Sequence, residues 1–136
     1  MFTPPSTRAA SAYKSVGIET SVSAADPHEL INLLFDSLLQ SLGLAKSALA
    51  RGDIVGKGRA IGRAVRLIEE GLKASLNEAQ GGELAANLHD LYDYCTFHLT
   101  MANVKNDSGK IEEVERLLAP LAQSWKQIRA QALKGA

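Results

Sequence analysis

Four segments of this chain place apolar or small residues alternately three and four positions apart, and short polar or glycine-containing breaks separate the segments. Such spacing puts these side chains on one side of an α-helix. The second segment shows it most regularly, at Ile54, Gly58, Ile61, Val65, Ile68 and Leu72. Amphipathic helices with short connections bury their apolar faces by packing side by side. The sequence therefore predicts an all-α, antiparallel four-helix bundle.

Local signals predict where the helices begin and end. Asp26 is a typical N-cap, and Pro27 fits the first helical position. Gly52 predicts the end of this first helix near Ala50, and Asp53 is placed to cap the second. The later breaks are expected at Gly81-Gly82 and Asn106-Asp107-Ser108-Gly109. We expect two parts: a flexible or capping N-terminal tail at residues 1–25, and the bundle at residues 26–134.

Composition limits the possible function classes. Lys and Arg together number 15, as do Asp and Glu, so the net charge is zero and a nucleic-acid binder is not expected. Cys95 is the one cysteine, which excludes an intramolecular disulfide and fits a cytoplasmic protein. No run approaches the roughly 18 apolar residues that a membrane-spanning helix needs, so no membrane insertion is expected.

Two of the predicted helices carry more apolar surface than one core-facing stripe. On the third helix, Leu88, Tyr92, Cys95, Leu99 and Ala102 fall on one side, whereas Tyr94, Phe97, Met101 and Val104 fall almost opposite. On the first helix, leucines and other apolar residues cover more than half of the circumference. Contiguous apolar patches usually mark interaction sites. The pattern leaves open an ordinary monomer or homodimer that buries this surface, and it does not say which stripe faces the core.

Motifs that resemble cofactor or metal sites lack the context for that chemistry. The glycines of residues 56–62 have the spacing GxGxxxG, follow no predicted strand and lie within a helical pattern. Cys95 and His98, with His89 nearby, lack the further cysteines of a zinc site. No group of residues has the context of a catalytic centre. We expect no cofactor, no metal and no enzymatic activity.

A histidine phosphotransfer domain is the alternative function. Such domains are helical bundles, and His89 and His98 are the histidines that lie within a bundle helix. Asp90 and Asp93 lie close to His89, and their negative charge opposes phosphorylation there. This signalling hypothesis therefore has weak support from the sequence.

Basic residues gather on one side of the second helix, at Arg59, Arg63, Arg66 and Lys73. A solvated face is the usual explanation for such a cluster. Salt bridges to nearby acids are a further explanation, and the candidates are Glu112, Glu113 and Glu115. The functional alternative is a docking patch for an acidic partner.

Several short motifs together resemble a known family. They are, in order, Ala12-Tyr13, Ile18-Glu19-Thr20, Asp26-Pro27-His28-Glu29-Leu30-Ile31, Leu34-Phe35-Asp36, Gly52-Asp53, Gly81-Gly82-Glu83, Asn87-Leu88, Leu91-Tyr92-Asp93-Tyr94, Ala102-Asn103 and Trp125-Lys126-Gln127-Ile128. Their order and spacing resemble the flagellar secretion chaperone FliS family, the export chaperones of flagellin. The resemblance covers about residues 12–130.

The resemblance implies a cytoplasmic export chaperone. It implies binding of the disordered carboxy-terminal segment of flagellin, prevention of premature polymerisation and delivery to the export gate of the flagellar type III apparatus. It also implies that a tail tyrosine, here Tyr13, covers part of the binding surface in the free protein. The residues that we predict to contact the partner are Tyr13, Ile18, Leu30, Leu34, Phe35, Leu38, Leu91, Tyr94, Phe97, Met101 and Val104.

Overall fold

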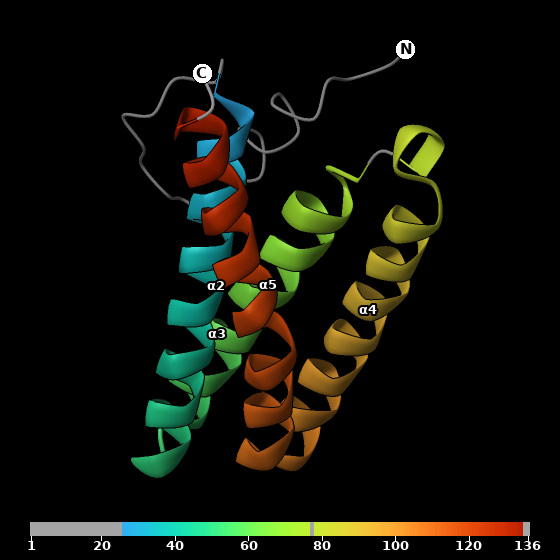
Figure 1. The fold of residues 1–136 in the computed structure, drawn as a ribbon. Helices are drawn as coiled ribbons and strands as arrows, with labels where there is room; N and C mark the ends of the chain where they lie inside the picture. The colour runs from blue at the N-terminus through green and yellow to red at the C-terminus, as the bar shows by residue number, and fades with distance from the viewer. Residues whose placement is uncertain (1–25, 77, 135–136) are drawn as a thin grey trace.

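The computed structural model describes residues 26–76 and 78–134, and it is an antiparallel helical bundle (Figure 1). Tyr13 and Ile18 lie outside the described residues. The elements are α2 (Pro27–Ala50), α3 (Ile54–Arg66), η1 (Leu67–Lys73), α4 (Glu78–Lys105) and α5 (Ser108–Lys134). The described part of the chain contains no strand. The predicted all-α bundle is therefore confirmed.

The first two helices begin where their capping residues predict. The Glu29 N–H donates to Oδ1 of Asp26 over 3.1 Å, and the Gly56 N–H donates to Oδ1 of Asp53 over 2.9 Å. Each carboxylate thereby satisfies a backbone donor that has no partner within its own helix. Gly52 lies between the two helices with φ of 74°, a conformation that glycine adopts without strain. These caps fix the short connection that sets α2 antiparallel to α3.

The second helix differs from the prediction in its last third. Its α-helical part ends at Arg66, and the chain continues as the π-helix η1 to Lys73. The wider π-helical turns let four of seven residues point inward, namely Leu67, Ile68, Gly71 and Leu72. The chain leaves the helix soon after Lys73, and α4 begins at Glu78. The Gly81-Gly82 pair, where the sequence predicts a break between helices, therefore lies within α4. A kink remains there, at Gly82 with φ of 56°.

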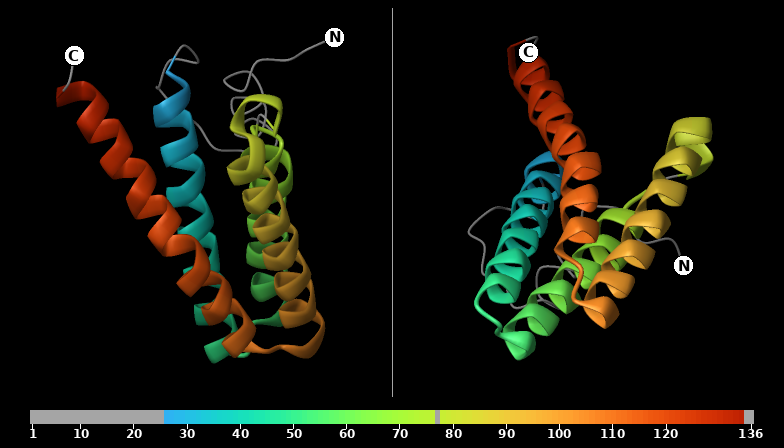
Figure 2. Two further views of the ribbon diagram at one scale, coloured as in Figure 1. Left: turned by 45° about the vertical axis from the view of Figure 1, so that its right-hand side comes forward. Right: turned by 90° about the horizontal axis from the view of Figure 1, so that it is seen from below.

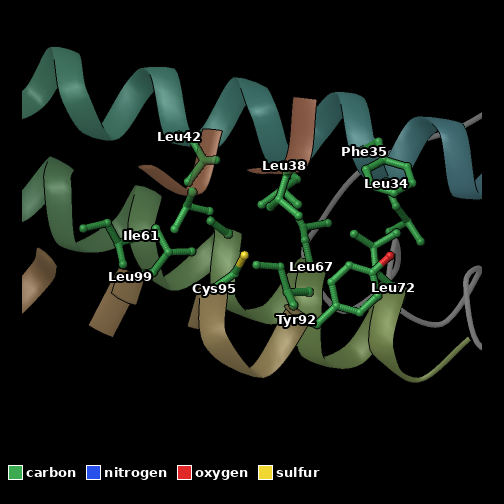
Figure 3. Close-up of a cluster of buried hydrophobic side chains, with 14 of the residues drawn as sticks. Leu34, Phe35, Leu38, Leu42, Ile61, Leu67, Leu72, Tyr92, Cys95 and Leu99 are labelled. Carbon is green, nitrogen blue, oxygen red and sulfur yellow. The ribbon is translucent and has the colours of Figure 1, made fainter. Parts of the chain in front are cut away.

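One core runs the length of the bundle and settles which stripe of α4 points inward. Tyr92, Cys95, Leu99 and Ala102 are buried, and Figure 3 shows the first three directed toward α2 and α3. Tyr94, Phe97 and Val104 on the opposite side are exposed. The described structure therefore assigns one stripe to the core and the other to the surface.

The apolar surface of α2 is mostly core rather than an open face. Leu30, Leu34, Phe35 and Leu38 are all buried, and Figure 3 labels the last three within the core. Of the two possibilities that the sequence leaves open for the apolar surface of this helix, burial within the bundle is the one observed for these residues. The reason is that α2 packs against α3, η1 and α5 together, so a wide arc of its circumference faces other helices.

Cys95 provides a test of how tightly this core is closed. Its side chain is fully buried, and burial raises the pKa of its thiol to about 11. Only the thiolate reacts with a disulfide reagent, so we expect Cys95 at neutral pH to be modified at least about a hundredfold more slowly than a free thiol. The modification should require global unfolding of the chain. Labelling rates at increasing urea concentration measure this. Fast labelling without urea would show that the core opens locally around α4.

Candidate binding surface

An apolar groove opens between four elements at the end of the bundle where α2 begins. Its volume is about 350 Å³. It is lined by Ile31, Phe35, Leu72, Ser75, Leu76, Leu84, Leu88, Tyr92, Leu121, Ser124, Trp125 and Ile128. All but two of these side chains are aliphatic or aromatic, and none carries a formal charge. We call this hollow the apolar groove.

The groove exists because two neighbouring helices separate along their length. α4 and α5 meet at the turn of Asn106 and Asp107, and their other ends diverge (Figures 1 and 2). The kink at Gly82 lies in the first part of α4 that lines the opening. The bundle is therefore closed at the end with this turn and open at the other end.

The floor of the groove is buried and its rim is exposed. Phe35, Leu72 and Tyr92 form the floor, and burial raises the pKa of Tyr92 to about 12, so its phenol stays neutral at physiological pH. Leu84 and Ile128 stand at the rim, and Leu84 is 68% exposed. A hollow with an uncharged floor and exposed aliphatic rim suits an apolar side chain or a short amphipathic helix.

Trp125 forms one wall and ties α5 to the start of α2. Its Nε1–H donates to the backbone oxygen of His28 over 2.8 Å, and its ring stacks on the His28 ring with centroids 4.8 Å apart. The polar edge of the indole is thereby satisfied, which leaves its apolar body to pack against the core and line the groove. The wall of the groove is thus held in place before any ligand arrives.

The outward stripe of α4 forms a second candidate surface, which we call the α4 ridge. It consists of Tyr94, Phe97, Met101 and Val104, of which Met101 is half-buried and the others are exposed. The Tyr94 hydroxyl donates to Oε1 of Glu113 over 2.7 Å, and the Tyr94 ring meets His98 edge-on at 4.1 Å. These contacts hold the aromatic start of the ridge against α5.

The structure divides the predicted contact residues among three environments. Tyr94, Phe97, Met101 and Val104 form the α4 ridge. Leu91 is half-buried against the core. Leu30, Leu34, Phe35 and Leu38 belong to the core, although Phe35 also reaches the groove floor. The role of all of these residues in binding stays a prediction.

Sequence reasoning did not single out the rim residues Leu84 and Ile128. Leu84 follows the Gly81-Gly82 pair, and Ile128 is spaced like the core residues of the last helix. Their neighbours Leu88 and Trp125 are half-buried and pack on the core. One signal was available: Trp125 and Ile128 close a family motif, and a tryptophan near an apolar surface often marks a binding site.

The histidines have environments that do not suit phosphotransfer. Nδ1 of His89 lies 3.6 Å from carboxylate oxygens of both Asp90 and Asp93. The Lys73 ammonium lies 2.6 Å from Asp93 and holds the pKa of that carboxyl below its usual value. The side chain of His98 is mostly buried. No observation on the described residues favours the signalling hypothesis.

The three acidic or histidine groups near Lys73 are also close enough to share a metal ion. Ligand atoms of His89, Asp90 and Asp93 lie within 4.8 Å of one another. The Lys73 ammonium already supplies a positive charge to Asp93, and Asp90 and Asp93 are exposed. Exposed groups of this kind are common on helix surfaces, and the cluster is no basis for a metal centre.

Comparison with known proteins adds to this geometry. A family model described as "Flagellar protein FliS" matches residues 9–132. The chain is 47% identical to the flagellar secretion chaperone FliS of Salmonella typhimurium over 121 residues, 89% of this chain and 90% of that protein. It is 42% identical to FliSB of Pseudomonas aeruginosa, over 83% of this chain and 89% of that protein. It is 38% identical to FliS of Escherichia coli, over 85% of this chain and 85% of that protein. Within the described residues, no helix is long and apolar enough to cross a bilayer.

Proposed function

This chain belongs to the FliS family of flagellar secretion chaperones, and from that premise we propose that it binds the carboxy-terminal segment of flagellin before export. A chaperone acts by binding, without a catalytic step. We place this activity in the cytoplasm, where it keeps flagellin from polymerising and brings it to the export gate of the flagellar type III apparatus. No contact among the described residues supports the alternative of a phosphotransfer bundle.

The observation that carries the proposal is the preformed apolar groove. A segment that is disordered when free loses conformational entropy when it folds on a partner, and apolar burial must offset that cost. The groove offers a neutral floor at Phe35, Leu72 and Tyr92 and exposed rim residues that lose water contact when a ligand is bound. The α4 ridge adds exposed apolar surface on the side of α4 opposite to Leu88 and Tyr92 of the groove, which suits a ligand that wraps around the bundle.

We expect Leu84→Asp to weaken binding of a flagellin carboxy-terminal peptide by at least about tenfold, because it puts a charge where an apolar ligand packs. The side chain is 68% exposed, so the fold should be unchanged. Calorimetric titration of the full chain measures the affinity. The same variant in a flagellated strain should lower the amount of flagellin in the culture medium.

Val55→Asp is the matched control. Val55 is 65% exposed on α3 and does not line the apolar groove, so it receives the same charge at similar exposure but elsewhere. We expect its peptide affinity and its flagellin export to match those of the parent chain. Equal affinities for both variants would exclude the groove as the binding site, and absence of binding by the parent chain would exclude the function itself.

A further inference from the structure

A second hollow lies between α2 and α3, on the half of α2 opposite to the apolar groove. Its volume is about 300 Å³. It is lined by Ser41, Leu44, Ala48, Arg51, Gly56, Arg59, Ala60 and Arg63. On α2, the apolar groove is lined by Ile31 and Phe35 near the start of the helix, whereas the second hollow is lined by residues from Ser41 onward. The two sites share no lining residue. We call this second hollow the arginine hollow.

Two of its three arginines have no counter-charge among the described residues. Arg59 and Arg63 make no ion pair there, so of the explanations that the sequence leaves open for these two residues, salt bridges to nearby acids do not apply. One acid expected to pair with them is engaged elsewhere, since Glu115 binds Lys46 over 2.6 Å. Like charges four residues apart on a helix repel each other. An anion placed between Arg59 and Arg63 would relieve that repulsion.

The third arginine is only weakly occupied. A terminal nitrogen of Arg51 lies 3.7 Å from Oδ2 of Asp53, and both side chains are exposed. The other oxygen of Asp53 already caps α3 through the Gly56 N–H. Exposed ion pairs of this length contribute little to stability. Arg51 is therefore free to turn toward a better acceptor.

Buried polar atoms in the same hollow also have no partner. Ser41 is only 1% exposed, and its Oγ makes no hydrogen bond, although a helical serine can donate to the carbonyl oxygen one turn back. The buried Nε of Arg63 is likewise unpartnered. Leaving such buried donors without an acceptor lowers the stability of the fold. The Ser41 hydroxyl and the unpaired guanidinium groups of Arg59 and Arg63 therefore favour a ligand with acceptor oxygens.

We propose that the arginine hollow binds an acidic segment of a partner polypeptide, with carboxylates on Arg59 and Arg63. The apolar part of the hollow selects a peptide over a free anion. Leu44 is 51% exposed and lies beside Ala48 and Ala60, so the ligand should carry an aliphatic side chain as well as carboxylates. Ser41 is recessed in the hollow. A peptide side chain can reach inward to it, whereas the flat surface of an anionic membrane cannot, so the geometry favours a peptide. This inference does not rest on the proposed function.

The test uses a short dye-labelled peptide of glutamate and leucine, with binding to the full chain followed by fluorescence anisotropy. We expect the double variant Arg59→Gln/Arg63→Gln to bind at least about tenfold more weakly, as the loss of two charge-assisted contacts implies. Raising the salt concentration should weaken the parent complex and close that difference. Arg116→Gln is the matched control, since Arg116 is an exposed arginine on α5 outside the hollow.

Further measurements locate the bound peptide and compare it with other anionic ligands. Amide chemical-shift changes on peptide addition should centre on Ser41, Leu44 and Arg63. Equal affinities for the double variant and Arg116→Gln would overturn the proposal. Displacement of the peptide by equimolar inorganic phosphate, or tighter binding to anionic lipid vesicles than to the peptide, would overturn it as well. Should the double variant unfold, Arg59→Gln alone serves, because this side chain is exposed.

Discussion

Replacing Leu38 by alanine is expected to lower the free energy of unfolding by about 2–5 kcal/mol, the range for leucine truncation in a close-packed core. Its side chain has no exposed surface, and Figure 3 shows it projecting from α2 toward the segment that carries Leu67. A cavity at this position removes contacts between α2 and η1. Urea unfolding followed by circular dichroism measures the change.

Leu44→Ala is the control for this measurement. It removes the same atoms from the same helix, but Leu44 is half exposed, and the expected change is below about 0.5 kcal/mol. The comparison also tests the original assignment of Leu38 as a contact to the partner. If Leu38→Ala left stability unchanged and abolished peptide binding, Leu38 would be a surface contact and the buried position would be wrong.

The helix boundaries that sequence predicts correctly are those set by local chemistry. Asp26 and Asp53 cap their helices through hydrogen bonds to residues three positions ahead, so no distant part of the chain is needed to place them. Gly52 likewise acts through its own backbone conformation. Helix starts and turns of this kind are properties of a few neighbouring residues, which is why they can be predicted from the sequence.

The assignment of faces depends on packing and could not be predicted in the same way. On α4, the stripes of Cys95 and of Phe97 are both apolar, and only the packing of α4 against α3, η1 and α5 decides that Cys95 points inward. On α2, apolar residues cover a wide arc because three elements pack around it. Excess apolar surface therefore remains exposed on α4, where its role in binding stays a prediction, and on α2 it reflects a large share of the core.

The groove itself depends on four elements at once. Its rim residue Leu84 follows a kink, and its wall residue Trp125 lies more than thirty residues further along the chain. Neither the π-helical η1 nor the divergence of α4 from α5 leaves a periodic signal, because both follow from tertiary packing. The same holds for the charges: Glu115 pairs with Lys46 of α2 and not with an arginine of α3, which depends on tertiary packing.

Trp125→Ala is expected to lower the free energy of unfolding by about 3 kcal/mol and to weaken flagellin-peptide binding. The indole packs on the core, stacks on His28 and donates a hydrogen bond to its carbonyl, so three contributions are lost together. Lys126 also pairs with Asp36 over 3.1 Å, but this exposed contact contributes little. Without Trp125, α5 loses its stacking and hydrogen-bond contacts with the start of α2, and the groove loses a wall.

Two further variants separate these contributions. Trp125→Phe keeps a ring against the core and loses the N–H donor, so we expect a loss of about 1 kcal/mol. His28→Ala removes the stacked ring but leaves the backbone acceptor in place, and the expected loss is about 0.5–1.5 kcal/mol. Because the chain has one tryptophan, its fluorescence reports groove occupancy in the parent chain and in His28→Ala. If Trp125→Ala unfolded like the parent chain, α5 would be anchored to α2 by other contacts, and the wall of the groove would not depend on the indole.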